Sequence, residues 1–339
     1  PDQKLLNSIL PNQAPRTQNL LSYEANIYRD WVWGEHENNQ SLEIIVSLLG
    51  DKKVEHLFVP GCGAGRLLYD LANSLNPTIA IGSDINPLLL MIAKAMLNNQ
   101  SVNLVEFPSA AKDLQSVAVE QTLKPVDAPS NIHLVFSDLL KTPFAHGAFD
   151  CVVTPWLIDI LPSRLEVTLQ ALNQYLPVGG MWINFGSLVF NQSDVALHYT
   201  LEEIVELVKL FGFEIEEYKQ QEIDYLNSPH NAGHRMEVVT AWRAVKTHDI
   251  EAPNTTQHLP DWLLDSKAPV PAMQEFAQFA QQQSVAGEIM SWANGQLSLS
   301  KMANRFSKKY KVDKVAAESS ILQLYRQVYE ESLMRRYNL

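Results

Sequence analysis

Short apolar runs alternate with amphipathic segments along most of this chain. Seven runs bounded by polar or turn residues predict β-strands at 54–60, 78–82, 132–136, 149–154, 181–185, 213–223 and 237–245. Apolar residues at helical spacing predict helices at 20–51, 66–73, 87–98, 164–175 and 201–211. Strands that alternate with helices predict an α/β fold around a parallel sheet, with the last two strands forming an end hairpin.

The 339 residues exceed the length of one typical domain and divide into four predicted parts. A helical N-terminal segment (1–50) precedes the α/β domain (51–246). A proline-containing linker (247–282) then leads to a helical C-terminal domain (283–339). Within the α/β domain, the connection at 99–131 is unusually long, which predicts either a functional loop or small elements of its own.

A glycine-rich turn follows the first predicted strand. Gly61, Gly63 and Gly65 stand at alternate positions before a helix, and the next strand leads to Asp84. Glycine lets the backbone approach a ligand where a Cβ would clash. An acid at the tip of the second strand can accept hydrogen bonds from both hydroxyls of a ribose. The segment therefore predicts a nucleoside site.

The glycine spacing narrows the range of nucleoside ligands that the site could bind. The pattern is G-x-G-x-G, whereas a dinucleotide fingerprint is G-x-G-x-x-G, and no phosphate-binding lysine follows as it does in a P-loop. This spacing resembles motif I of the methyltransferases that use S-adenosylmethionine (SAM). A nicotinamide or flavin site and a purely structural glycine turn remain open as alternatives.

Composition and charge exclude several classes. Hydrophobic residues make up 46% and charged residues 19% of the chain, as in globular proteins. No apolar run reaches the ~18 residues of a membrane span and no signal peptide is apparent, so we expect a cytoplasmic protein without membrane contact. A net charge of −12 argues against nucleic-acid binding. Cys62 and Cys151 are too few for a disulfide framework or a metal cluster, and we expect both to be reduced.

The C-terminal region differs in charge from the rest. Residues 283–339 contain nine Lys or Arg and five Asp or Glu, a net charge of +4 that leaves −16 on the remainder. The segment 295–310 resembles the small helical, winged-helix-like modules that include the peptide-binding PqqD-like domains. Packing or homo-oligomer contact, recognition of a peptide or protein, and nucleic-acid binding are the alternatives for this region.

Four further segments carry a more specific pattern: YRDW (28–31), VPGCGAGR (59–66), FDCVVTPWLID (149–159) and GGMWINFG (179–186). Together they resemble the carnosine N-methyltransferase family over about residues 20–245. The resemblance implies a class I, Rossmann-like methyltransferase sheet of seven strands. It also implies SAM as cofactor, S-adenosylhomocysteine as product and an imidazole ring nitrogen as methyl acceptor.

The resemblance also implies roles for the cofactor-binding residues, with the segment 1–50 covering the cofactor. Arg29 would pair with the carboxylate of SAM, unless it is a surface arginine. Asn26 stands where the family has a glutamine that contacts the cofactor. The three glycines would line methionine and ribose, and Asp84 would bind the ribose hydroxyls.

Three further cofactor contacts follow from the same resemblance. Asp138 and its neighbour Leu139 would face the adenine amine, although Asp138 could instead be an acid that caps a turn. Pro155 would continue past the fourth strand along the cofactor.

Asp159 is the predicted catalytic and substrate-binding residue. It follows the fourth strand at the carboxyl edge of the sheet, where ligands bind in such folds. A neutral imidazole has one N–H and one lone pair, so an acid that holds the N–H leaves the other nitrogen free to attack the methyl group. The alternative is an aspartate that caps a helix.

The chain differs from the family at positions that contact the substrate there. Asn191 replaces a histidine that contacts the substrate, and His234 and Met236 replace two tyrosines. His198, His230 and Tyr225 are nearby candidates to take over these roles. The predicted acceptor is therefore a small histidine derivative, either a carnosine-like dipeptide or a thiohistidine of the ovothiol type.

Two functions of other classes stay open. The chain could methylate a peptide or protein held by the C-terminal domain. It could also be a non-catalytic module that binds SAM, since the family's substrate-contacting histidine and tyrosines are absent.

Overall fold

The computed structural model of the chain describes residues 23–141, 143–161, 163–190, 197–252, 285, 287–292, 297–322 and 324. These residues belong to two compact units, which meet in sequence at residues 253 and 254. The predicted division of the chain into four parts stays a prediction.

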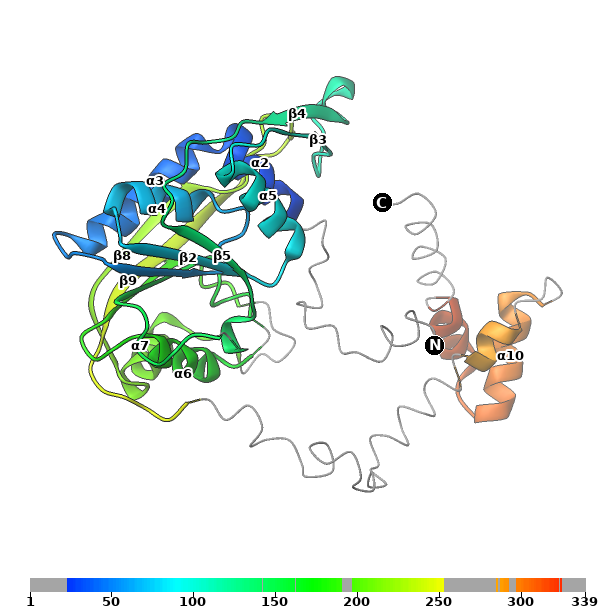
Figure 1. Ribbon diagram of the computed structural model, residues 1–339. Coiled ribbons are helices and arrows are strands. Elements are labelled where there is room, and N and C mark those ends of the chain that lie inside the picture. Colours follow the sequence, from blue (N-terminus) through cyan, green and yellow to red (C-terminus); the bar gives the residue numbers. More distant parts are fainter. Residues whose placement is uncertain are drawn as a thin grey trace, which may run out of the picture. The chain divides into compact units, whose positions relative to one another are not determined.

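The first unit is built around a seven-stranded sheet, as predicted (Figure 1). In spatial order the strands are β5 (Ile132–Phe136), β2 (Ile79–Asp84), β1 (His56–Pro60), β6 (Cys151–Pro155), β7 (Met181–Gly186), β9 (Met236–Lys246) and β8 (Phe213–Asp224). The first five are parallel, and β9 and β8 continue the sheet as an antiparallel hairpin. This is the predicted class I methyltransferase sheet.

Helices cover both faces of the sheet (Figure 1). One face carries α3 (Glu35–Leu49), α4 (Arg66–Leu75) and α5 (Pro87–Leu97), and the other carries α6 (Leu165–Tyr175) and α7 (Leu201–Leu210). Local signals define several helix starts, among them the Asn86 cap with Pro87 at the first position of α5. A capping box between Thr200 and Glu203 begins α7.

The central strand β1 is buried on both faces. Leu57 and Val59 pack in the cluster below α3 and α4, and Phe58 packs in the opposite cluster against α6. Residues two apart share a face of a strand, so the apolar run 57–59 supplies both layers of the core. The position of β1 determines where the glycine turn lies.

The predicted helix at 20–51 is interrupted. It consists of α2 (Glu24–Tyr28), a π-helical turn η2 (Arg29–Trp33) and α3. Gly34 allows the break, because a Cβ at this position would lie 2.4 Å from the carbonyl oxygen of Arg29. The Arg29 carbonyl accepts hydrogen bonds from the Gly34 N–H and the Asn38 side chain.

The long connection at 99–131 carries its own elements. Strands β3 (Val102–Glu106) and β4 (Val119–Leu123) form a separate antiparallel ribbon, with a short 3₁₀ turn, η3 (Leu114–Ser116), between them. The loop before this turn pairs with the loop 225–235 between β8 and β9: Ala232 N–H donates to Ala110 O at 2.7 Å, and Lys112 N–H donates to His230 O at 2.9 Å. We call this pair of loops the clasp.

The second unit is helical in its described residues. Its clearest element is α10 (Leu299–Tyr310), which begins at a Ser298 cap. A small core joins it to neighbouring helical turns through Ile289, Trp292, Met302, Ala303, Ala317 and Ile321. The likeness to a winged-helix module stays a prediction. None of the helices in the described ranges has the length and apolarity of a membrane span.

Lys246 ends the sheet with a buried cation. Lys246 is 1% exposed, and its Nζ donates to the carbonyl oxygens of Asn173 at 2.6 Å and Leu176 at 2.7 Å. Asp249 completes the site as an ion-pair partner. Because Asn173 and Leu176 lie at the C-terminal end of α6, the ammonium satisfies carbonyls that a helix leaves unpaired.

We expect Lys246→Met to lower the free energy of unfolding by about 2–4 kcal/mol, because it removes two charge-assisted hydrogen bonds and leaves buried carbonyls unpaired. Denaturant unfolding of the full chain measures this. Lys209→Met, at an exposed position of α7, is the matched control and should change stability little. Equal effects of the two substitutions would contradict this role of Lys246.

Candidate functional site

The glycine turn lies at the carboxyl end of β1, at the center of the parallel strands. Gly61, Gly63 and Gly65 have φ values of 67°, 57° and 89°, in the left-handed region that favours glycine. A Cβ at Gly61 would lie 2.9 Å from Leu157, and one at Gly65 would lie 2.8 Å from Ala93. No atom lies within 4 Å of a Cβ built at Gly63, so this residue faces open space.

Asp84 closes the turn from the end of β2. Its Oδ2 accepts the Gly63 N–H at 2.9 Å and its Oδ1 accepts the Asn86 N–H at 2.8 Å. Burial raises the pKa of Asp84, and these backbone hydrogen bonds oppose the rise. Each carboxylate oxygen has a second lone pair. The open space at Gly63 and this oriented acid fit the ribose of a nucleoside such as SAM.

Arg29 is a partly buried cation that two acids hold in place. Its side chain is 16% exposed and forms ion pairs with Asp30 at 2.7 Å and Glu37 at 3.4 Å. These two acids raise the pKa of Arg29 and outweigh the effect of burial. Glu37 also accepts the Leu226 N–H at 2.9 Å, which ties the arginine to the clasp.

Asp138 caps a turn. Its Oδ1 accepts the Leu140 N–H at 2.9 Å at the start of a 3₁₀ turn, η4 (Leu139–Lys141). Leu139 is buried in the core beside α6, and its carbonyl accepts the Tyr175 hydroxyl. The capping role that the sequence left open for Asp138 is therefore present, and its other carboxylate oxygen is available for a ligand.

Asp159 is a buried acid with spare hydrogen-bonding capacity. It is 6% exposed, and its Oδ2 accepts the Ser187 hydroxyl at 3.1 Å. Its Oδ1 is inaccessible to water and has no hydrogen-bond partner in the described part of the chain. Burial raises the pKa of Asp159 to about 6, although hydrogen bonds from its own backbone and from Ser187 lower it. Such a carboxylate gains from a ligand N–H.

Trp156 and Tyr225 form an aromatic pair next to Asp159. Trp156, directly after Pro155 at the end of β6, has a φ of 48°, and its N–H donates to the Phe185 carbonyl at 2.7 Å. The centroid of its ring lies 4.3 Å from the centroid of the Tyr225 ring. Gly186 makes room for this strained backbone, because a Cβ there would lie 3.0 Å from Trp156. Backbone strain of this kind concentrates at functional sites.

Burial raises the pKa of Tyr225, and nearby charged groups modify this rise. Arg29 and Arg235 oppose the rise, and Asp159 adds to it. Tyr225 therefore lies within electrostatic range of both Arg29 and Asp159. It is one of the substitutes that the sequence suggested, and it packs on Trp156, three residues before Asp159.

The other predicted substrate residues have separate positions. His234 is exposed, and its Nε2 lies 3.0 Å from Asp224 Oδ1. Met236 begins β9, is 48% exposed and does not line the cavity described next. Asn26 lies on α2, one turn before Arg29. Asn191 lies outside the described residues.

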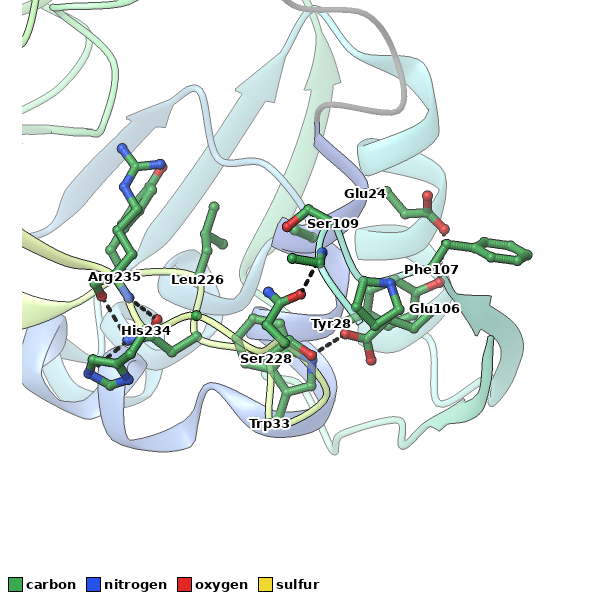
Figure 2. A pocket seen from close by; sticks show the side chains of 17 residues that line it. Glu24, Tyr28, Trp33, Glu106, Phe107, Ser109, Leu226, Ser228, His234 and Arg235 are labelled. Atoms are coloured by element: carbon green, nitrogen blue, oxygen red, sulfur yellow. Dashed lines mark hydrogen bonds between the residues drawn. The ribbon is translucent and has the colours of Figure 1, made fainter. Parts of the chain in front are cut away.

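A cavity of about 440 Å³ opens between α2 and the clasp. Figure 2 shows Glu24, Glu106 and Phe107 at one end, with His234 and Arg235 at the other. Tyr28, Trp33 and Tyr225 add aromatic surface. Because Tyr225 also contacts Trp156, the cavity begins beside the aromatic pair next to Asp159.

The sequence predicted some of these side chains and missed others. Gly63 with Asp84, and Asp159 at the edge of the sheet, are where their motifs placed them. Ser187 was not predicted as a partner of Asp159, and neither Glu24 nor Glu106 was predicted as a site residue. The only signal for Ser187 was its position directly after the GGMWINFG segment.

Comparison with known proteins agrees with this geometry. Residues 9–248 match the family model described as carnosine N-methyltransferase. A carnosine N-methyltransferase of Dictyostelium discoideum is 28% identical over 236 residues, covering 60% of this chain and 50% of that protein. The Drosophila melanogaster carnosine N-methyltransferase unmet is 26% identical over 215 residues, covering 56% and 46%.

A SAM-dependent methyltransferase of Methanosarcina mazei aligns in three dimensions with a TM-score of 0.44 at 14% identity, covering 60% of this chain and 98% of that one. The chain spans about half the length of the two curated relatives. The family model covers well over half of the residues. The chain belongs to the carnosine N-methyltransferase family.

Proposed function

We propose that the chain is a SAM-dependent N-methyltransferase that methylates an imidazole ring nitrogen of a small histidine derivative. Membership of the family implies SAM as the methyl donor. The observation that carries the proposal is the unpartnered Oδ1 of buried Asp159, beside the Trp156–Tyr225 pair. A carnosine-like dipeptide is the acceptor that the relatives' names favour.

The residues of this chain can hold the cofactor as follows. The left-handed glycine turn admits the ligand at Gly63, and Asp84 accepts hydrogen bonds from the ribose hydroxyls. Arg29 pairs with the methionine carboxylate, and Asp138 accepts from the adenine amine. Asn26, Leu139 and Pro155 complete the contacts. When bound, SAM would supply a methyl group that is activated by its bond to the positively charged sulfur.

Asp159 then orients the acceptor. With a pKa of about 6 it is mostly ionised at neutral pH, so its Oδ1 accepts the N–H of a neutral imidazole. The lone pair of the other ring nitrogen would then be free to take the methyl group that SAM would release from its sulfur. The product is an imidazolium, which the carboxylate stabilises and from which it can take the N–H proton.

Positioning supplies most of the acceleration in such a displacement, because two reactants held in line avoid the entropy loss of an encounter. Ser187 contributes by holding Asp159 Oδ2, and the acceptor's ring reaches Oδ1, which neighbouring side chains cover in this structure, once those side chains move aside. The roles of Asn191, His234 and Met236 in holding the rest of the acceptor remain part of the prediction.

A methyl-transfer assay tests the proposal. Labelled SAM is offered with histidine, β-alanyl-histidine and 5-thiohistidine, the last of which represents ovothiol-type acceptors. We expect one of them to be labelled, and Asp159→Asn to lower kcat/KM about a hundredfold or more while SAM binding persists. SAM binding without transfer to any small imidazole would contradict the proposal and favour a peptide acceptor or a non-catalytic role.

Asp159 should cost the protein stability at neutral pH. Its pKa is higher in the folded than in the unfolded chain, so the folded state holds the proton more tightly and loses stability as pH rises from about 4 to about 6. We expect Asp159→Asn to raise the free energy of unfolding at pH 7 by at most about 3 kcal/mol, with no gain below about pH 4.

Thermal unfolding across pH 3.5 to pH 7.5 (roughly, spanning both pKa values) measures this difference. Asp127→Asn, at an exposed position in the long connection, is the control and should leave the pH profile unchanged. A stability gain from Asp159→Asn that is the same at all pH values would show that the buried charge is not its cause.

Gly63→Ala tests whether Gly63 faces the cofactor, and a control at a second left-handed glycine accounts for backbone strain. The added methyl enters the open space in front of the turn, so we expect affinity for S-adenosylhomocysteine to fall about tenfold or more. Gly179→Ala is a matched control, because Gly179 also has a positive φ, of 85°, and no atom within 4 Å of an added Cβ. It follows α6, away from the glycine turn.

Both substitutions should cost about 1–2 kcal/mol of stability, as expected for an L-residue in the left-handed region. Titration calorimetry with S-adenosylhomocysteine measures affinity, and denaturant unfolding measures stability. Equal affinity of the two variants would show that Gly63 does not face the cofactor.

A further inference from the structure

Two carboxylates that line the cavity beside the clasp have no cationic side chain as a partner among the described residues. Glu24 accepts the Tyr28 hydroxyl at 3.0 Å, and Glu106, 4% exposed, accepts from Ser228 at 2.5 Å and Gln121 at 2.8 Å. Neither forms an ion pair with any residue that the structure describes. Buried or half-buried acids are costly unless a positive charge compensates them.

The cations of the cavity are already compensated. Arg235 pairs with Glu237, and its guanidinium lies 4.7 Å from the center of the Tyr225 ring. His234 pairs with Asp224. The two ends of the cavity therefore differ, because the cationic end is neutralised by neighbouring acids while the acidic end is not (Figure 2). The net potential inside favours a positive ligand group.

Aromatic rings in the cavity also favour a positively charged ligand group. Tyr28, Trp33, Phe107 and Tyr225 line the cavity together with the two acids. A cation gains energy over the faces of such rings, and a carboxylate accepts hydrogen bonds from an ammonium. Acids and rings in one cavity therefore suit an amine that keeps its N–H groups.

We propose that this cavity binds the free ammonium group of the methyl acceptor, with Glu24 as the carboxylate that it contacts. The inference rests on the proposed function, because it assigns the part of the acceptor beyond the imidazole. Tyr225 connects the two regions: it lines the cavity and packs on Trp156, which precedes Asp159 by three residues. An acceptor can therefore place its ring at Asp159 and its amine in the cavity.

The two acids have different tasks. Both oxygens of Glu106 already accept hydrogen bonds from Ser228 and Gln121, so this acid holds the clasp to the ribbon of β3 and β4 and adds negative potential. Glu24 accepts a hydrogen bond from the Tyr28 hydroxyl with one oxygen and lies at the start of α2, so its remaining acceptor capacity is open to a ligand.

Calorimetry on the full chain, saturated with S-adenosylhomocysteine, tests the assignment. The probes are β-alanyl-histidine and propionyl-histidine, which differ only by the amino group. We expect the first to bind about tenfold tighter or more to the unmodified chain, as for a charge-assisted hydrogen bond. Glu24→Gln should abolish this preference, and Glu43→Gln, at an exposed position of α3, should keep it.

Equal affinity for the two probes, no binding of either, or a preference that survives Glu24→Gln would overturn the assignment. Methyl transfer, measured separately, keeps the two proposals apart. A dipeptide that binds with the expected preference but accepts no methyl group contradicts the proposed function and leaves the ammonium site standing. Methylation of both probes with equal affinity contradicts the ammonium site alone.

Discussion

The candidate site depends on a turn that only glycine adopts without strain. Three left-handed glycines reverse the chain after β1 without sending side chains into the space ahead. The Gly63 N–H then reaches the Asp84 carboxylate, so the backbone of one strand orients the acid of the next. Because β1 is buried on both faces, core packing holds the end of the strand from which the turn starts. The positions of the other site residues are defined relative to it.

The charges around this turn suit positively charged ligands. Asp84, Asp159 and Glu106 are substantially buried and form no ion pair among the described residues, whereas Arg29 is held between two acids. Such an arrangement costs stability in the empty protein. In the methyl-transfer step of the proposed reaction the positive charge moves from a sulfonium to an imidazole ring. Acids beside both ends of that path compensate it throughout, which gives a physical reason to retain them.

How much the sequence predicted follows from the range of the interactions involved. The strands, the glycine turn and Asp84 were predictable because apolar runs and left-handed glycines are local signals. The break before α3 was missed, since it depends on how closely Gly34 approaches the Arg29 carbonyl. The clasp was also missed. Its hydrogen bond between Glu106 and Ser228 joins residues 122 apart, and no local pattern encodes such a pairing.

The two halves of the site are therefore built by different means. The cofactor side is made by the ends of buried strands, where a change disturbs the core. The proposed acceptor side includes the loops of the clasp, which lie outside the sheet, and surface loops in general accept substitutions more readily than buried strands. His234 and Met236, for which the resemblance implies tyrosines in the family, lie at or beside these loops. The acceptor can consequently change while Gly63 and Asp84 stay as they are, because the two sets of contacts share few atoms. Tyr225 packs on Trp156 at the end of β6 and also lines the cavity beside the clasp, so it connects the two halves.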